Sequence, residues 1–280
     1  MTTLPVPDDS GITGRDQGPV NLTVPVAAFF DVDNTLIRGA SIYHFARGLA
    51  ARNLLGPTDV IRMTMRHVSF RVHGTEDLSQ VDSVRQAALA FVAGRRVDDM
   101  VQLGEEIYNE TIASRIWEGT KELTERHLAA GEQVWLVTAT PVELADILAR
   151  ELGLTGALGT VAEIEDGVYT GRLVGGLLHK EAKATAIRAL AEREGLDLAR
   201  CTAYSDSAND LPMLSLVGHP NVVNPDRRLR AEAARRGWPV HEFRSGRRAT
   251  AIVVLAAAGA GAIAGGAAAG LAIRRRRLST

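Results

Sequence analysis

The sequence predicts an α/β fold with a mainly parallel sheet, an inserted all-helical cap and a C-terminal hydrophobic helix. Short apolar runs rich in β-formers alternate with longer stretches of helical periodicity, which is typical of a parallel sheet covered by helices. One long helical stretch interrupts this alternation after the first strand. Near the C-terminus, the 25 residues 249–273 carry no charged side chain.

The composition is that of a globular protein: 280 residues, 46% apolar and 23% charged. The net charge of −1 is uneven, because residues 244–280 hold seven arginines and no acid. The rest of the chain is therefore acidic, which argues against nucleic acid as a partner and leaves anionic lipid as a partner for the tail. The single cysteine, Cys201, excludes an intrachain disulfide and fits a reducing intracellular compartment.

Residues 1–24 have neither the basic nor the apolar region of a secretory signal, and their Pro, Gly, Asp and Thr content predicts a disordered segment. The core begins with the buried strand Val26–Phe30, which is short and apolar throughout. Glycines after periodic stretches end predicted helices, and Asp166-Gly167 within an alternating stretch predicts a hairpin. In order, we expect helix Glu118–Ala130, strand Gln133–Val137, helix Pro141–Leu152, hairpin Ala162–Leu173, helix Glu181–Gly195, strand Cys201–Ser205, and short strands Asn221–Asn224 and Val240–Phe243.

Between the first two core strands, from Ile37 to Ile116, apolar residues recur three and four positions apart without strand-like alternation. This pattern predicts a bundle of about four helices. We therefore expect an α/β core formed by residues 25–37 and 117–243, a helical cap at 38–116, and a C-terminal anchor with a basic tail at 244–280.

Polar clusters follow three of the predicted core strands: Asp31-Val-Asp33-Asn-Thr35, Thr138-Ala-Thr140 and Asp206-Ser-Ala-Asn209-Asp210. Ligands of open parallel sheets bind beyond the carboxyl ends of the strands, so these segments are expected to converge. Their four carboxylates would repel one another unless a cation lay among them. Oxygen ligands without a Cys or His cluster favour a hard ion, most simply Mg²⁺, which keeps positions for water and substrate phosphate.

This arrangement suits phosphoryl transfer. A carboxylate can attack phosphorus and form an aspartyl-phosphate, while Mg²⁺ and a lysine offset charge on the phosphoryl oxygens. A second carboxylate two residues further on can protonate the leaving group. An EF-hand calcium loop is the alternative for Asp31 and Asp33, but Leu36 and Ile42 replace the glycine and glutamate that it requires.

These motifs resemble those of haloacid dehalogenase-like (HAD) phosphohydrolases, in particular subfamily IB, the phosphoserine-phosphatase-like branch with a helical cap. The resemblance covers residues 25–243 and implies a Rossmann-like core and Mg²⁺ as cofactor. It implies these roles: Asp31 as nucleophile and metal ligand, Asp33 as acid/base with its carbonyl facing Mg²⁺, Thr138 and the Ala139 amide on the phosphoryl group, Lys183 on the phosphoryl charge, Asp206 as metal ligand, and Asn209 and Asp210 as support.

Two points in this resemblance involve a choice. Lys183 fits the family's spacing before a helix, and Lys180 is the alternative. Where phosphoserine phosphatases carry a glutamate that engages the substrate ammonium, this chain has Ala40. The expected function is Mg²⁺-dependent hydrolysis of a small phosphorylated metabolite, phosphoserine-like or related. The alternatives are a membrane-associated lipid-phosphate phosphatase or phosphotransferase, and a non-catalytic membrane-attached interaction protein.

The uncharged run 249–273 is long enough to span a bilayer but weakly apolar, with 12 Ala, 5 Gly and seven Ile, Val or Leu. Gly261-x-x-x-Gly265 and Gly266-x-x-x-Gly270 would suit helix packing and hence a homodimer. We expect a membrane anchor behind a cytoplasmic catalytic body; a surface-lying or disordered tail is the alternative. Arginines flank both ends of the run, so charge does not fix its orientation.

Overall fold

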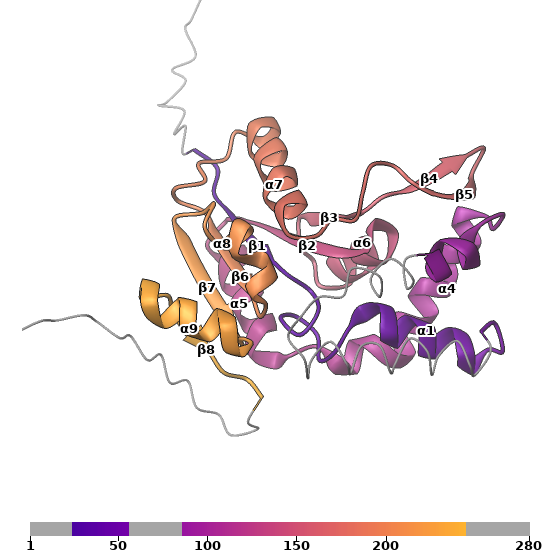
Figure 1. The fold of residues 1–280 in the computed structure, drawn as a ribbon, viewed down its shortest axis with the longest axis horizontal. Coiled ribbons are helices and arrows are strands. Elements are labelled where there is room, and N and C mark those ends of the chain that lie inside the picture. The colour runs from indigo at the N-terminus through magenta and orange to yellow at the C-terminus, as the bar shows by residue number, and fades with distance from the viewer. Residues whose placement is uncertain (1–23, 56–85, 245–280) are drawn as a thin grey trace, which may run out of the picture.

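The computed structural model describes residues 24–55 and 86–244 (Figure 1). Its main sheet has six strands in the order β3-β2-β1-β6-β7-β8, and every neighbouring pair is parallel. The predicted parallel α/β core is therefore confirmed. The strands are β1 (Ala27–Phe30), β2 (Gln133–Pro141), β3 (Gly156–Thr160), β6 (Thr202–Ser205), β7 (His219–Val223) and β8 (Val240–His241).

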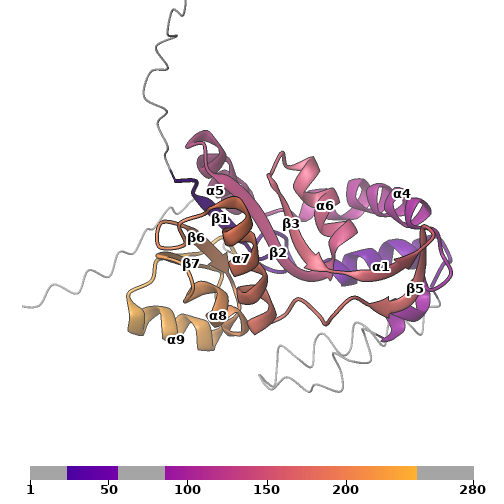
Figure 2. The ribbon, with the colours of Figure 1, turned by 90° about the horizontal axis from the view of Figure 1, so that it is seen from above.

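Strand β1 lies in the middle of the sheet, and all four of its residues are buried, as its continuous apolar sequence requires. Ala28 and Phe30 pack in one apolar cluster with residues of α5 and α6, whereas Ala27 and Phe29 pack in a second cluster with residues of α7, α8 and α9. The two helical layers are visible in Figures 1 and 2. These helices are α5 (Glu118–Ala129), α6 (Val142–Glu151), α7 (Glu181–Glu194), α8 (Leu211–Leu214) and α9 (Arg227–Arg236).

Within the insert, residues 38–116, the described segments are helices joined by turns and loops at 38–40, 52–55 and 93–96. The insert contains α1 (Ser41–Ala51), helical residues 86–92, α4 (Val97–Ile107), the π-helix η1 (Tyr108–Ile112) and the 3-10 helix η2 (Ala113–Arg115). Helix α1 approaches α4 closely at Gly48, where a Cβ would lie 2.6 Å from the Ile107 side chain. A side chain at this position would therefore push the two helices apart. The rest of the predicted cap, residues 56–85, lies outside the described residues, and the domain boundaries stay predictions.

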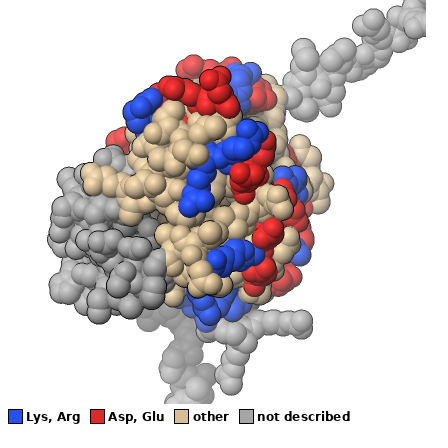
Figure 3. All heavy atoms as spheres, turned by 90° about the vertical axis from the view of Figure 1, so that its right-hand side faces the viewer, with Lys and Arg blue, Asp and Glu red and all other residues tan. Residues whose placement is uncertain are grey.

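A hairpin of β4 (Ala162–Glu165) and β5 (Val168–Leu173) extends from the core to the insert. Its turn has positive φ at Asp166 and Gly167, as the sequence predicts for a tight hairpin. The Tyr169 N–H donates to the Arg95 carbonyl at 3.0 Å and the Val97 N–H donates to the Gly167 carbonyl at 3.0 Å, so backbone bonds join hairpin and insert. On this side of the molecule, acidic and basic side chains are interspersed (Figure 3).

The structure contains two elements that the sequence did not predict. Edge strand β3 begins at Gly156 and includes Gly159, and glycine is a poor strand former, so its pairing with β2 determines its conformation. Helix α9 buries only Leu229 and Ala233, too few for a clear periodic signal. Among residues 24–55 and 86–244 no helix has the length and apolar character to cross a membrane. The run 249–273 and the segment 1–23 lie outside the described residues.

Candidate active site

The ends of three neighbouring strands bring the predicted site residues to one edge of the sheet. Asp31 follows β1, Asp206 follows β6, and Thr138 lies in the last part of β2. Phe30, the last residue of β1, is in register with Leu136 of β2 and with Tyr204 of β6. Each of these partners lies two positions before a predicted site residue, Thr138 or Asp206. Because the strands are parallel, all three segments leave the sheet at the same level, as the sequence predicts.

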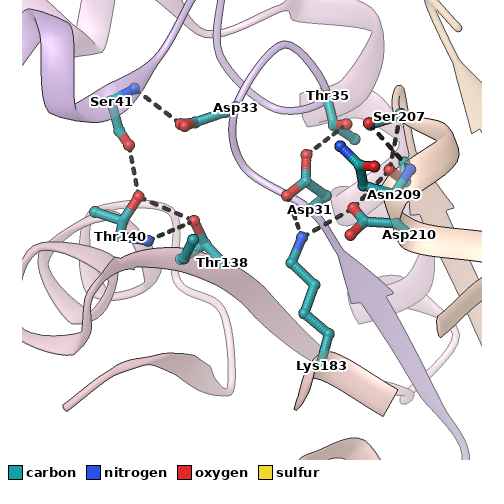
Figure 4. A network of polar contacts seen from close by, with 12 residues as sticks. Asp31, Asp33, Thr35, Ser41, Thr138, Thr140, Lys183, Ser207, Asn209 and Asp210 are labelled. Atoms are coloured by element: carbon teal, nitrogen blue, oxygen red, sulfur yellow. Dashed lines mark hydrogen bonds and ion pairs between the residues drawn. The ribbon is translucent and has the colours of Figure 1, made fainter. Parts of the chain in front are cut away.

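A buried lysine joins the first and third segments (Figure 4). Lys183 lies in the first turn of α7 and is 3% exposed; its Nζ donates to Asp31 Oδ1 at 2.6 Å and to Asp210 Oδ2 at 2.9 Å. Burial lowers the pKa of Lys183, but the Asp210 and Asp31 carboxylates outweigh burial and raise that pKa overall. The ammonium therefore stays charged. Of the two lysines considered, Lys183 contacts Asp31, and Lys180 is the N-cap residue of α7.

The buried acids outnumber this ammonium. Burial raises the pKa of Asp31, Lys183 lowers it, and repulsion from Asp210 and Asp33 raises it again, to about 7 in all. Burial also raises the pKa of Asp206 well above its ordinary value, and repulsion from Asp31 and Asp210 raises it further. Of the three buried carboxylates, the Lys183 ammonium contacts only those of Asp31 and Asp210, and a further cation would relieve the repulsion among all three.

The donor set fits Mg²⁺ as that cation. Within the described part of the chain, no three acidic, His or Cys side chains form a ready metal cluster. Mg²⁺ usually needs only one or two protein carboxylates, because water and substrate phosphate complete its shell. Asp31 and Asp206 supply two carboxylates whose pKa values are raised first by burial and then by repulsion from neighbouring acids. Such carboxylate oxygens are the ligands of a hard ion.

Hydroxyl groups hold the third segment in shape. Ser205 Oγ donates to Asp210 Oδ2 at 2.7 Å, on the same oxygen that accepts from Lys183. Asp210 is the N-cap residue of α8, but its side chain makes no capping bond there. Asn209 is held through its backbone, because its N–H donates to Ser207 Oγ at 3.3 Å. The carboxylate of Asp210 therefore points at Lys183 rather than at its own helix.

Asp226, which begins α9, supports the same segment from outside. Its Oδ1 accepts from the Leu229 N–H at 2.7 Å, an ordinary N-cap bond, and its Oδ2 accepts from the Ala208 N–H at 2.9 Å. Its own N–H donates to the Asp206 carbonyl at 2.8 Å. One side chain therefore fixes both the start of α9 and the loop that carries Asp206.

Asp33 lies in a separate branch of the site. Asn34 adopts φ = 62°, in the left-handed region that Asn tolerates, and reverses the chain after Asp33. The turn closes through two bonds with Gly39: the Asn34 N–H donates to its carbonyl at 3.1 Å, and Asn34 Oδ1 accepts from its N–H at 3.2 Å. Asp33 Oδ1 then accepts from the backbone N–H of Ser41 at 2.8 Å.

Three hydroxyls connect this branch to the end of β2 (Figure 4). Ser41 Oγ lies 2.6 Å from Thr140 Oγ1, and Thr138 Oγ1 donates to Thr140 Oγ1 at 2.9 Å. The Thr140 N–H donates to Thr138 Oγ1 at 3.1 Å. The Ala139 carbonyl accepts from Thr160 Oγ1 at 2.8 Å, and this bond fixes the orientation of the peptide group between Ala139 and Thr140.

The structure brings the predicted residues together in two groups: Asp31, Lys183, Asp206, Asn209 and Asp210 in one, and Asp33, Thr138 and Ala139 in the other. Their catalytic roles stay predictions. Sequence reasoning assigned no role to Ser41, Ser205 or Asp226. Asp226 three positions before Leu229 is an N-cap signal that could have been read. Ser41 and Ser205 carry no such signal, because their partners are set by the fold.

Comparisons with known proteins identify relatives of this chain. A model of the haloacid dehalogenase-like hydrolases matches residues 28–215. The chain is 56% identical over 273 residues to phosphoserine phosphatase SerB1 of Mycobacterium tuberculosis, covering 98% of this chain and 87% of that protein. It is 30% identical over 221 residues to a histidinol-phosphatase of Neisseria meningitidis, covering 78% and 98%.

Among solved structures, a protein of unknown function from Bordetella pertussis Tohama I superposes with a TM-score of 0.69 at 29% identity, covering 79% of this chain and 100% of that chain. The family match runs through all the predicted site residues, from Asp31 to Asp210. The names of the two curated relatives specify different phosphate esters.

Proposed function

Because the chain belongs to the haloacid dehalogenase-like hydrolases and is a phosphatase, we propose that it hydrolyses small phosphate monoesters through an aspartyl-phosphate on Asp31, with Mg²⁺ as cofactor. The observation that carries the proposal is the buried Lys183 ammonium shared by Asp31 and Asp210, beside an Asp206 repelled by both. A site with surplus buried negative charge is suited to a cation and a phosphoryl group.

In the first step, a carboxylate oxygen of Asp31 attacks phosphorus as the bond from phosphorus to the ester oxygen breaks. Asp33 gives its proton to that ester oxygen, which leaves as an alcohol. In the second step, water attacks the phosphorus of the aspartyl-phosphate. Asp33 takes the proton of this water, inorganic phosphate leaves, and the Asp31 carboxylate is regenerated.

The remaining residues bind and orient the phosphoryl group. We assign its oxygens to the Thr138 hydroxyl, the Ala139 N–H and the ammonium of Lys183, which offset the charge that develops in transfer. Mg²⁺, held by the Asp31 and Asp206 carboxylates and the Asp33 carbonyl, supplies further charge neutralisation when bound. Thr35 Oγ1 donates to Asp31 Oδ2 at 3.0 Å and thereby orients the nucleophile.

The test is hydrolysis of p-nitrophenyl phosphate with Mg²⁺ or with EDTA, in wild type and in Asp31→Asn. We expect turnover only in wild type with Mg²⁺, and a loss of at least roughly 10³-fold in Asp31→Asn, as for other nucleophile removals. Equal rates in the two proteins would reject the enzyme and favour the non-catalytic interaction protein. Release of alcohol without an equal amount of phosphate would instead identify a phosphotransferase.

The substrate class is a phosphate ester of a primary alcohol. Phosphoserine and histidinol phosphate, which the names of two relatives specify, share this group and an adjacent amine. Ala40 is buried and uncharged, so it cannot pair with such an amine as a glutamate would. A panel of phosphoserine, histidinol phosphate and phosphatidate tests the assignment; preference for phosphatidate would favour the lipid-phosphate alternative.

We also propose that residues 249–273 attach a cytoplasmic catalytic body to a membrane, and that their glycine spacing permits a homodimer. Arg227 and Arg228 are exposed on α9, whose start lies next to Arg244, because the Arg244 guanidinium donates to the Asn224 carbonyl. These arginines and Arg244, which precedes the uncharged run by five positions in the sequence, suit anionic headgroups.

Flotation of the full chain with vesicles containing anionic lipid tests this attachment. The run gains only roughly 2–4 kcal/mol from its seven larger apolar residues, whereas one central Lys costs about 2.5–3.5 kcal/mol. A double variant with Ala257→Lys and Ala264→Lys should therefore no longer float with the vesicles. A wild-type chain that does not float, or a double variant that floats equally, would reject the anchor.

A further inference from the structure

Two groups of one residue, the backbone N–H and the hydroxyl of Ser41, contact separate parts of the candidate active site (Figure 4). The N–H donates to Asp33 Oδ1 at 2.8 Å, and Oγ lies 2.6 Å from Thr140 Oγ1. Ser41 is 2% exposed, so water does not compete for these bonds. Asp33 and Thr140 lie at the ends of β1 and β2, whereas Ser41 belongs to the insert.

The N–H is available because Ser41 is the first residue of α1. The first N–H groups of a helix have no partner within it, and the N-cap residue Ala40 has no side chain that could accept from them. Asp33 supplies the missing acceptor, and its negative charge is favoured at the positive end of the helix dipole. Within the described residues, Asp33 Oδ2 accepts no hydrogen bond, so it is the oxygen that can face a substrate.

The hydroxyl connects the same helix end to the phosphate side. Thr140 Oγ1, which contacts Ser41, also accepts from the Thr138 hydroxyl at 2.9 Å. Displacement of α1 by about one hydrogen-bond length would therefore break its contacts with Asp33 and with Thr140 together. The position of the insert therefore affects both Asp33, the proposed acid/base, and Thr138, the proposed phosphate-binding residue.

We propose that Ser41 is a positioning residue that holds the Asp33 carboxylate in place for protonation of the leaving group, and that this holds only while α1 is docked on the core. The inference rests on the proposed function, because it assigns Asp33 the role of acid. It adds that the insert, through a residue that does not touch the reacting atoms, controls the proton transfer.

Ser41→Pro tests the N–H directly. Proline is well tolerated at the first position of a helix, and Ala40, at φ = −95° and ψ = 131°, already has the extended conformation that a residue before proline requires. The variant therefore removes the donor and the hydroxyl without breaking α1. Ser41→Ala removes the hydroxyl alone. Glu118→Pro is the matched control, since Glu118 is exposed, begins α5 and follows an extended N-cap residue.

The readout is the dependence of kcat on the leaving group. An alkyl phosphate needs a proton on its departing oxygen, whereas nitrophenolate leaves without one, so poor acid positioning harms only the alkyl ester. We expect Ser41→Pro to lower kcat by about 10²-fold for O-phosphoserine or glycerol phosphate and by less than about tenfold for p-nitrophenyl phosphate. Asp33→Asn should show the same discrimination, Ser41→Ala a smaller one, and Glu118→Pro none.

The proposal is overturned if Ser41→Pro slows both esters by the same factor, or if its ratio of rates equals that of Ser41→Ala. If Ser41→Pro does not fold, two variants of Thr140 provide the test. Thr140→Val, which removes the hydroxyl that contacts Ser41, should lower kcat for the alkyl ester more than for p-nitrophenyl phosphate. Thr140→Ser, which keeps that hydroxyl, should show the wild-type ratio of the two rates. A wild type without activity, or an active Asp31→Asn, refutes the proposed function; with both behaving as expected, the Ser41 results bear on this inference alone.

Discussion

Replacement of Lys183 by Met gives the sharpest test of the electrostatics of this site. Met has nearly the same volume but no charge, so Asp31 and Asp210 would lose the ammonium that lies 2.6 and 2.9 Å from them. Both carboxylates and the lysine are less than one-tenth exposed, so water cannot replace the lost partner. Removal of one member of a buried ion pair typically costs about 3–5 kcal/mol.

The expected loss converts into a measurable shift of the urea midpoint. With a slope of roughly 2–3 kcal/mol per M for a chain of this size, the midpoint should fall by about 1–2.5 M. The measurement is made in EDTA, so that no divalent ion takes the place of the ammonium. The deficit should shrink at about pH 5, because the pKa of Asp31 is already raised to about 7 with the lysine present and a protonated carboxyl needs no partner.

Lys121→Met is the matched control. Lys121 lies 3.7 Å from Glu125 on the surface of α5, with side chains 43% and 59% exposed. Such a pair contributes at most about 1 kcal/mol, so its midpoint should move by less than about 0.5 M. A shift for Lys183→Met no larger than that of Lys121→Met would refute the reasoning, since it would mean that solvent already screens the site.

Two further outcomes are expected. Asp226→Ala removes the N-cap of α9 and the acceptor of the Ala208 N–H. The free energy of unfolding, measured by thermal unfolding, should therefore fall by about 1–3 kcal/mol, and kcat should also fall. An unchanged kcat would show that the start of α9 does not affect the active site. For His241, burial and then Arg126 lower the pKa below 6.5. The folded state therefore binds fewer protons, and the free energy of unfolding should fall as pH drops through 6.5. Comparison of urea midpoints at about pH 7.5 and about pH 5.5 should give a smaller difference in His241→Gln; an equal difference would contradict this.

The sequence could predict the end of β1 and its acids because the relevant information is local. An apolar run that stops at two aspartates specifies both a buried strand and a polar edge, and the structure has β1 ending at Phe30. The choice of Lys183 rested on the resemblance to the family's spacing before a helix, and in the structure the Lys183 ammonium donates to Asp31. In both cases a short stretch of sequence carries the signal.

The contacts that the sequence could not predict are those set by distant pairing. Ser41 and Thr140 are 99 residues apart, and only the docking of α1 against the end of β2 brings their hydroxyls together. Strand β3, with glycines at 156 and 159, depends on its pairing with β2 for the same reason. A pattern of residue types does not contain this information, because it arises from tertiary packing that overrides local propensity.

Asp31 and Asp33 have the same chemistry two positions apart, yet their surroundings differ in kind. Asp31 is 6% exposed and is held by a lysine and the hydroxyl of Thr35. Asp33 is half-buried and is held by one neutral N–H, which leaves an oxygen available. Bonds to both oxygens of Asp31 fix its orientation for attack on phosphorus, whereas Asp33 Oδ2 accepts no hydrogen bond from the described residues and can face the leaving group. The chain reversal at Asn34 creates this difference, because it turns Asp33 away from Lys183 and toward α1.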